Sequence, residues 1–261
     1  MKRAACAVFV IVTAPMPALL AQSTRLGWPA DPNAGADDVL VLRQLTVSDQ
    51  KGYGTMPFAH LEALLPRLNT LAELAILEKA GTSPSVHPAA AFAAEGRLRA
   101  SEVTINALRL LSLRPLLGRD FTADDERARH RVAILTYGAW QRHFAGRPDA
   151  VGSVGWRRSE SGGREDVVIV GVLPRDVPAR APELDPDAEI LVLAPRAFEV
   201  HSPARRVFAP VLRPAAGVTA RQLQIRLDEA RAARLRRSGG VASRVPVGVA
   251  PAATSARTEI G

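Results

Sequence analysis

Apolar and polar positions recur along the chain with two different periods, which predicts a mixture of strands and helices. In residues 38–47 a period-two pattern predicts a strand with Val39, Val41 and Leu45 on one side. In residues 57–69 the apolar side chains recur at helical spacing, so an amphipathic helix is predicted there. Further strands are predicted at residues 71–79, 131–135, 154–158, 166–173, 189–193 and 207–212, with 154–158 and 166–173 paired as a hairpin. Residues 80–90 are predicted to be a loop.

One predicted helix carries a stripe of aromatic residues. Thr136 follows the strand at 131–135 and is a suitable N-cap, because its side-chain oxygen can accept a hydrogen bond from the first turn. Tyr137, Trp140 and Phe144 then share one face of the helix. A ligand cage is the alternative interpretation, but a stripe beside a buried strand favours packing in the domain core.

Two further helices have clear boundaries. The apolar stripe over residues 105–111 must end near Arg114, because proline follows and disfavours helical backbone before it. Thr219 and Gln222 have the spacing of a capping box, which opens a helix that runs to about Arg236. The residues of this helix predicted to face inward are Leu223, Leu227 and Ala230. Strands and helices alternate without the long βαβ series of a doubly wound fold, so the predicted fold class is α+β.

The N-terminus has the pattern of an export signal. Lys2 and Arg3 precede the uncharged apolar run Ala4–Ala21, so residues 1–21 are predicted to be a signal peptide or an N-terminal membrane anchor. A cytoplasmic protein with a buried N-terminal helix is the remaining alternative. Residues 22–36 are predicted to be a linker, because they are rich in turn-forming residues. The protein is therefore expected in the periplasm, or anchored in the inner membrane and facing the periplasm.

Composition narrows the classes of partner. The 261-residue chain has a net charge of +8, but its basic residues are scattered among acidic ones, so no nucleic-acid partner is predicted. The densest basic cluster, in residues 231–237, falls at a helix C-terminus, where positive charge offsets the helix dipole. Cys6 is the sole cysteine, which excludes an intramolecular disulfide and a cysteine-ligated zinc site.

Catalytic motifs do not emerge from the sequence. There is no G-x-S-x-G nucleophile elbow and no H-E-x-x-H zinc motif, and none of the five histidines lies within four residues of another. Asp124-Asp125-Glu126 lacks the spaced oxygen ligands of a calcium loop and is interpreted as a solvated turn. The protein is predicted not to be an enzyme, with no cofactor and no metal. An exported hydrolase and an unrelated periplasmic ligand-binding protein are kept as alternatives.

Four stretches, in order, resemble one family. Residues 106–125, with Arg114-Pro115 and Gly118-Arg119, are similar to its segment N-F-F-x-V-L-G-V-R-P-x-L-G-R-x-F-T-x-x-D. Residues 132–144 are similar to V-A-V-L-S-x-x-x-W-x-R-x-F, residues 167–174 to T-V-V-G-V-M-P, and residues 212–219 to L-K-P-G-V-T. The family is the MacB-like periplasmic core domain of ABC transporter permeases. The sequence departs from it at Ala107-Leu108, where an aromatic pair is usual, and at Ser112, where glycine is usual.

The resemblance implies a porter-like βαβ portion with an inserted, β-rich subdomain. It assigns residues 37–237 to the core domain and leaves 238–261 as a tail expected to be disordered. It also implies a non-catalytic role, in which the domain transmits motion to a permease or adaptor protein of an ABC-type exporter. No G-x-x-x-x-G-K-[ST] motif occurs, so any ATP hydrolysis is expected in another chain. A non-functional front fragment of a split permease is a further alternative.

Candidate contacts with a partner protein are placed in loops, because helices and strands are expected to supply the core. The predicted contact residues are Arg119 and Phe121 in one turn, and Arg157, Arg158 and Arg164 at the tip of the hairpin. Ordinary turn structure is the alternative for each of them, since few exposed residues dominate an interface.

Overall fold

The computed structural model describes residues 39–44, 56–57, 64, 68–79, 84–88, 96–127, 131–159, 162–181, 183–194, 207–237 and 247–251. The leader predicted at 1–21 and the linker at 22–36 lie outside these residues, as does most of the helix predicted at 57–69.

The described elements are mostly strands with a few helices between them, and most strand pairs are antiparallel, which is typical of an α+β fold. The strands are β1 (Leu40–Gln44), β2 (Met56–Pro57), β3 (Ala72–Glu78), β4 (Val86–His87), β5 (Ala100–Val103), β6 (Leu117–Gly118), β7 (Arg131–Leu135), β8 (Val154–Arg158), β9 (Arg164–Val172), β10 (Ile190–Leu193), β11 (Val207–Pro214) and β12 (Val247–Pro251). The helices are α4 (Ala107–Leu110), α5 (Tyr137–Phe144), α6 (Val177–Arg180) and α7 (Ala220–Arg237), with 3₁₀ turns η1 (Asp125–Arg127) and η2 (Pro148–Ala150).

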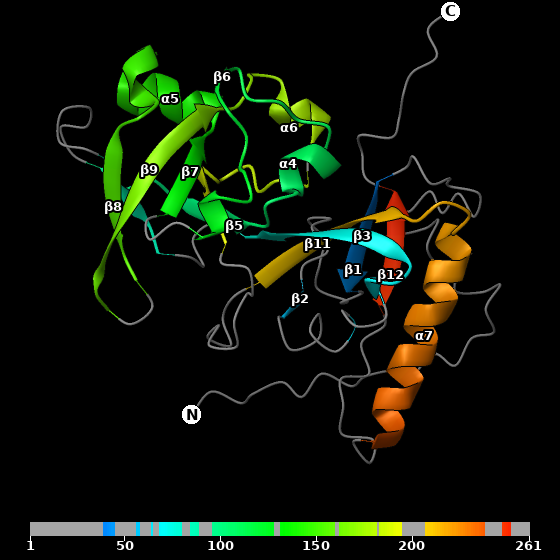
Figure 1. Cartoon of the computed structure of the whole chain (residues 1–261). Helices are drawn as coiled ribbons and strands as arrows, with labels where there is room; N and C mark the ends of the chain where they lie inside the picture. The colour runs from blue at the N-terminus through cyan, green and yellow to red at the C-terminus, as the bar shows by residue number, and fades with distance from the viewer. Residues whose placement is uncertain are drawn as a thin grey trace, which may run out of the picture.

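All of these strands belong to one mixed sheet in the order β12-β1-β11-β3-β5-β10-β7-β9-β8-β4, with β2 beside β11 and β6 beside β9. Only β5–β10 and β7–β9 are parallel among the pairs that the structure describes. β3 and β11 pair over seven positions, although β4 to β10 lie between them in sequence. The chain between β3 and β11 is therefore an inserted, β-rich part, and Figure 1 shows it as the left-hand lobe.

The inserted part curls back on itself. β4 pairs with β8 and is also bridged by backbone hydrogen bonds to Leu98, just before β5. In the sheet order, β5 and β8 are separated by three strands, yet an ion pair joins Glu102 on β5 to Arg157 on β8. This part of the sheet is thus strongly curved and nearly closed.

The core consists of three apolar clusters, one in each lobe and one shared by both. One lies between the β1–β3–β11 face and α7, and includes Leu40, Phe208 and Leu223. A second packs α5 onto the concave face of the inserted part. The third spans both lobes, because it contains Val41 and Val211 together with residues of β5, β7 and β10. Burial of this shared cluster makes the sheet one packed unit.

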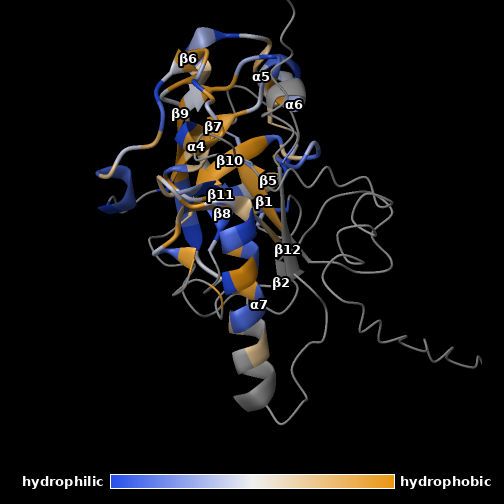
Figure 2. Ribbon diagram, turned by 90° about the vertical axis from the view of Figure 1, so that its right-hand side faces the viewer, coloured by the Kyte–Doolittle hydropathy of each residue, from blue (hydrophilic) through white to orange (hydrophobic). Residues whose placement is uncertain are grey.

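Helix α7 begins at the capping box predicted from the sequence, and it covers the lobe formed by β1, β3 and β11. The Thr219 backbone N–H donates to Gln222 Oε1 at 2.8 Å, and the Gln222 N–H donates to Thr219 Oγ1 at 3.3 Å. Leu223, Leu227 and Ala230 are buried against the sheet, so the predicted inner face is confirmed. Figure 2 shows the alternation of hydrophilic and hydrophobic residues along the first half of this helix.

The helix predicted after Thr136 is confirmed with its cap. Thr136 Oγ1 accepts a hydrogen bond from the Ala139 N–H, and α5 ends at Ala145 in the left-handed conformation. Trp140 and Phe144 are buried in the cluster beneath α5, and Tyr137 packs against it. The aromatic stripe is therefore part of the core.

Two predictions of irregular structure are wrong. Residues 80–90, predicted as a loop, contain β4, and residues 238–261, predicted as a disordered tail, contain β12. β12 pairs with all five residues of β1. Both strands are short, and they form because a neighbouring strand offers unpaired backbone groups.

The first strand, predicted over 38–47, is described over Leu40–Gln44 and is buried on both faces at residues 40–42, while Leu45 lies outside the described residues. Val39 and Val41 pack in the cluster that spans the lobes, while Leu40 and Leu42 pack beneath α7. The prediction of one apolar side is therefore incomplete. A strand covered on both faces is apolar at every position, as Leu40, Val41 and Leu42 are.

Candidate functional site

The turn over residues 118–125 is built around a buried carboxylate. Arg119 donates two hydrogen bonds to Asp125, from Nη1 to Oδ2 at 2.6 Å and from Nη2 to Oδ1 at 2.8 Å. The backbone N–H of Thr122 donates to the same carboxylate at 2.7 Å. Burial would raise the pKa of Asp125, but the bonds from Arg119 and Thr122 hold it below its usual range. The motif thus makes a closed turn, in which both Nη groups of Arg119 donate hydrogen bonds to Asp125.

Gly118 occupies a position in this turn whose backbone conformation and packing require glycine. Its φ is +72°, and a Cβ built on it would lie 2.1 Å from the carbonyl oxygen of Val170 on β9. Only glycine allows the turn to lie this close to the strand.

Replacing Gly118 with alanine is expected to reduce the free energy of unfolding by more than replacing Gly152. Gly152 also has a positive φ, of +93°, but a Cβ there meets nothing within 4 Å. Gly152→Ala therefore isolates the left-handed backbone cost of about 1–2 kcal/mol, to which Gly118→Ala adds the collision with β9. Urea denaturation of both variants is the measurement, and equal losses would contradict this account of the turn.

Phe121 requires a correction, since it is predicted as a partner contact. Its side chain is 7% exposed and belongs to the apolar cluster that spans the two lobes. The ring anchors the turn to the core, so it is not available to a partner on the surface.

Arg157 requires the same correction. It lies in β8, within the strand predicted at 154–158, but its side chain is 4% exposed and so is not available to a partner. Nη1 donates to Glu102 at 2.7 Å and Nε donates to Glu165 at 2.9 Å, while Arg131 donates to the other oxygen of Glu165 at 2.8 Å. Burial would lower the pKa of Arg157, but the charges and hydrogen bonds of Glu102 and Glu165 raise it above its ordinary value. This buried network ties β5, β7, β8 and β9 together.

The other two hairpin arginines point outward. Arg158 ends β8 and Arg164 begins β9, so both belong to strands, and both are exposed. Trp156 lies on the same outer face, stacked on His87 at a ring separation of 4.1 Å. Of the five predicted contact residues, the structure places these two together on an open surface.

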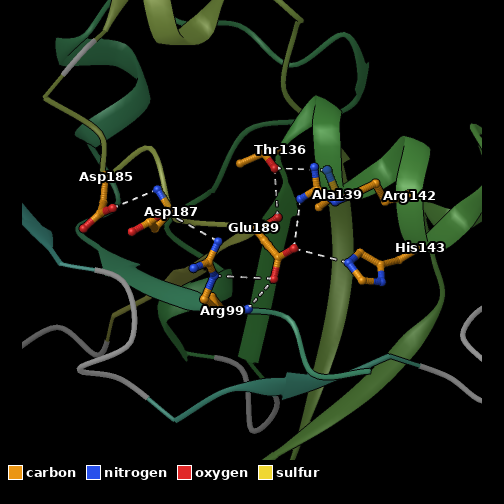
Figure 3. Close-up of polar contacts among 8 residues, drawn as sticks. All are labelled: Arg99, Thr136, Ala139, Arg142, His143, Asp185, Asp187 and Glu189. Carbon is orange, nitrogen blue, oxygen red and sulfur yellow. Dashed lines mark hydrogen bonds and ion pairs between the residues drawn. The ribbon is translucent and has the colours of Figure 1, made fainter. Parts of the chain in front are cut away.

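A polar centre around Glu189 was not predicted from the sequence (Figure 3). The Glu189 carboxylate is 13% exposed and lies just before β10. It accepts hydrogen bonds from the Arg99 backbone N–H at 3.0 Å and from Arg142 Nη2 at 2.9 Å, and lies 3.3 Å from His143 Nε2. Burial would raise the pKa of Glu189, but these contacts lower it below its usual range.

The Glu189 centre joins three segments of the inserted part. Arg99 precedes β5, Arg142 and His143 belong to α5, and the Glu189 carbonyl accepts a hydrogen bond from the capping residue Thr136. These partners lie 46 to 90 residues from Glu189 in sequence. No local pattern could have found them. The nearest sequence signal is the acidic residue at the start of a buried strand.

The pairing of His143 with Glu189 invites comparison with a catalytic dyad. A dyad needs a nucleophile within hydrogen-bond reach of the histidine. The hydroxyl group drawn in this cluster is that of Thr136, which donates to the Glu189 carbonyl and accepts from Ala139. The arrangement therefore fixes α5 against β10 and the segment before β5.

The described residues also bear on metal binding and on membrane crossing. Among them, no three or more His, Cys, Asp or Glu side chains lie close enough to hold a metal ion. Within the same residues, no helix has both the length and the apolar character needed to cross a bilayer.

The fold and its motifs agree with a known family. The family model of the MacB-like periplasmic core domain matches residues 30–254 of the sequence, which include every described element from β1 to β12. The chain belongs to the MacB-like periplasmic core domain family. The resemblance predicted from the sequence is thereby confirmed. This MacB-like domain is thus related to periplasmic domains of ABC transporter permeases.

Solved structures of similar shape include the periplasmic region of MacB from Actinobacillus actinomycetemcomitans. At 9% identity and a TM-score of 0.51, the match covers 82% of this chain and 88% of that one. The extracellular domain of the noncanonic ABC-type transporter YknZ from Gram-positive bacteria matches with 12% identity and a TM-score of 0.47, covering 82% and 99%. A permease-protein domain from Porphyromonas gingivalis matches with 14% identity and a TM-score of 0.48, covering 83% and 90%. No curated protein sequence matched.

The MacB match supports the fold. It agrees with the α+β class predicted for the MacB-like domain, whereas the porter-like character of the β1–β3–β11 lobe stays a prediction.

Proposed function

We propose that the chain works outside the cytoplasm as a non-catalytic domain of a MacB-like export or permease system. In this role it contacts partner or substrate proteins, and a permease or adaptor protein of the system is the expected partner. The observation that carries the proposal is the family match over residues 30–254.

A contact role also fits the chemistry of the described polar groups. The paired side chains Arg119, Arg157 and Glu189 each hold parts of the fold together. Glu189 lies beside a histidine, and the hydroxyl group in the cluster of Figure 3, that of Thr136, is bound to the Glu189 carbonyl and to the Ala139 N–H. A domain built in this way transmits force through packed strands and helices, and any ATP hydrolysis falls to another chain.

Capture from the cells that make the protein tests this proposal. The full chain, with a C-terminal affinity tag, is expected in the periplasmic or membrane fraction. Formaldehyde crosslinking is expected to enrich chains with permease helices, an ABC-type ATPase or an adaptor, relative to cells that carry an exported protein with the same tag.

Other outcomes of these experiments would favour a cytoplasmic protein or an exported hydrolase. Recovery of the chain from the cytoplasmic fraction defeats the extracytoplasmic role. Capture without any transport component, together with turnover of an ester, peptide or glycan by the purified chain, favours the exported hydrolase.

A further inference from the structure

The outer face of the β8–β9 hairpin combines exposed apolar, aromatic and arginine side chains. We call this surface the outer hairpin face; its residues are Val154, Trp156 and Arg158 from β8, Arg164 and Asp166 from β9, and His87 from β4. Side chains of β8 alternate strictly, with Gly155 and Arg157 buried and these three more exposed. The face is therefore a regular, rigid part of the sheet, and Figure 1 shows β8 along the outside of the inserted lobe.

Two arginines lie directly opposite each other on this face. Arg158 and Arg164 are cross-strand partners, so their Cβ atoms lie about 5 Å apart, where like charges repel. Arg158 is exposed and donates to the carbonyl of Gly162 at 3.1 Å. Arg164 lies 3.7 Å from Asp166, and these two side chains are 68% and 59% exposed. In contrast, the buried Arg157 is held between two carboxylates at less than 3 Å. A carboxylate from outside would relieve the repulsion between Arg158 and Arg164.

An apolar and aromatic surface adjoins this pair. Val154 is 49% exposed, and Leu116 and Ile225 are the other large apolar side chains exposed in the described part of the chain. Trp156 is stacked parallel to His87 at an interplanar angle of 5°, and the Arg164 guanidinium lies 5.1 Å from its ring centroid. Because β4 and β9 flank β8 on opposite sides, His87 and Arg164 fix the indole from two directions. Tryptophan and arginine held in this way are the residue types enriched at protein–protein interfaces.

The segment before β5 adds a further positive charge, that of Arg97, beside His87. Burial and the positive charge of Arg97 lower the pKa of His87, so its ring stays neutral near pH 7 and the positive charge beside it is that of Arg97. A membrane surface would also attract arginine, but membrane-anchoring tryptophans present a free ring to the interface. Trp156 is covered from two sides, which favours a protein partner.

From these contacts we infer that the outer hairpin face binds an acidic segment of a partner protein. A carboxylate of that segment sits between Arg158 and Arg164 through charge-assisted hydrogen bonds, and an apolar side chain beside it contacts Val154 and the edge of Trp156. The inference rests on the proposed function, since it names the chemistry of the partner and the surface that receives it.

Binding of a defined peptide to the purified full chain tests the inference. The probe is a fluorescein-labelled decapeptide of alternating Glu and Leu, and its anisotropy is measured at low and at physiological salt. The Arg158→Glu/Arg164→Glu variant is expected to weaken binding at least about tenfold, because attraction at both positions becomes repulsion. The matched control is Arg127→Glu/Arg226→Glu, which changes the net charge equally at side chains that are 68% and 62% exposed. This control is expected to bind like the parent.

Several results would overturn the inference. They are failure of the parent to bind the Glu–Leu peptide, equal binding of a Gln–Leu peptide, or equal weakening in the control variant. Binding to vesicles of phosphatidylglycerol and phosphatidylethanolamine that depends on Arg158 and Arg164, without peptide binding, would assign the face to a lipid surface. Circular dichroism of each variant excludes unfolding as the cause.

A second experiment separates this inference from the proposed function. A photo-crosslinking amino acid is placed in cells at Val154, or at Leu116 or Ile225, which are 53% and 40% exposed on other surfaces. If the crosslinker at Val154 captures a transport component through an acidic segment of that component, both the docking face and the proposed function are supported. Capture of such a component only from Leu116 or Ile225 overturns the docking face and leaves the proposed function intact.

Discussion

Replacing Arg157 with alanine is expected to lower the free energy of unfolding by about 3–5 kcal/mol. The guanidinium is 4% exposed and its main partner, the Glu102 carboxylate, is 5% exposed, so solvent screens their attraction little. In Arg157→Ala, Glu102 keeps a buried negative charge but loses the guanidinium that neutralises it. Urea denaturation followed by circular dichroism measures the loss.

A double variant shows whether the buried charge is the cause. Replacing both partners with apolar side chains, in Glu102→Leu/Arg157→Met, removes the charge together with its counterion and is expected to cost less than Arg157→Met alone. Glu165 keeps its bond to Arg131 in either variant. If the double variant loses as much as the sum of the two single ones, packing and not charge explains the network.

Replacing Trp140 with alanine is expected to cost about 3–5 kcal/mol, the range for deletion of a large buried aromatic side chain. The side chain is 9% exposed, its Nε1–H donates to the Arg147 carbonyl at 2.8 Å, and its ring meets Tyr137 edge to face at 5.6 Å. Thermal and urea unfolding by circular dichroism are suitable measurements, because the substitution itself removes one of the three fluorescent tryptophans.

Trp140→Phe is the matched control. It keeps most of the buried area and loses the hydrogen bond to Arg147, so a loss of about 1 kcal/mol is expected. A Trp140→Ala variant that is as stable as the parent but no longer binds its partner would show that the aromatic stripe is a binding site and not a core face.

Features with short-range signals were predicted well from the sequence. Thr136 caps α5 and Thr219 with Gln222 opens α7, since a capping residue and its partner lie within one turn. The departure at Ser112 also has a local meaning. Its φ is +55°, the left-handed region in which glycine is favoured, which accounts for the glycine usual at this position in the family pattern.

Features that depend on distant partners were missed. β12 exists through its pairing with β1, about two hundred residues earlier, and the Glu189 centre through partners on α5 and before β5. The hairpin arginines show the same limit: alternation in β8 buries Arg157 and exposes Arg158, although the two are adjacent and chemically identical. The sequence predicted both as partner contacts at the hairpin tip, because two adjacent arginines give no sign that one of them faces a buried carboxylate on another strand.

The pairing of β1 with β12 determines how the domain would respond to a pulling force. The strands are antiparallel, with Leu40 opposite Pro251 and Gln44 opposite Val247, so the chain enters β1 and leaves β12 at the same end. A load that draws residues 40 and 251 apart is therefore borne by one rung of hydrogen bonds at a time. β12 would unzip from β1 at low force, while β3 and β11, paired over seven positions inside the sheet, would stay joined.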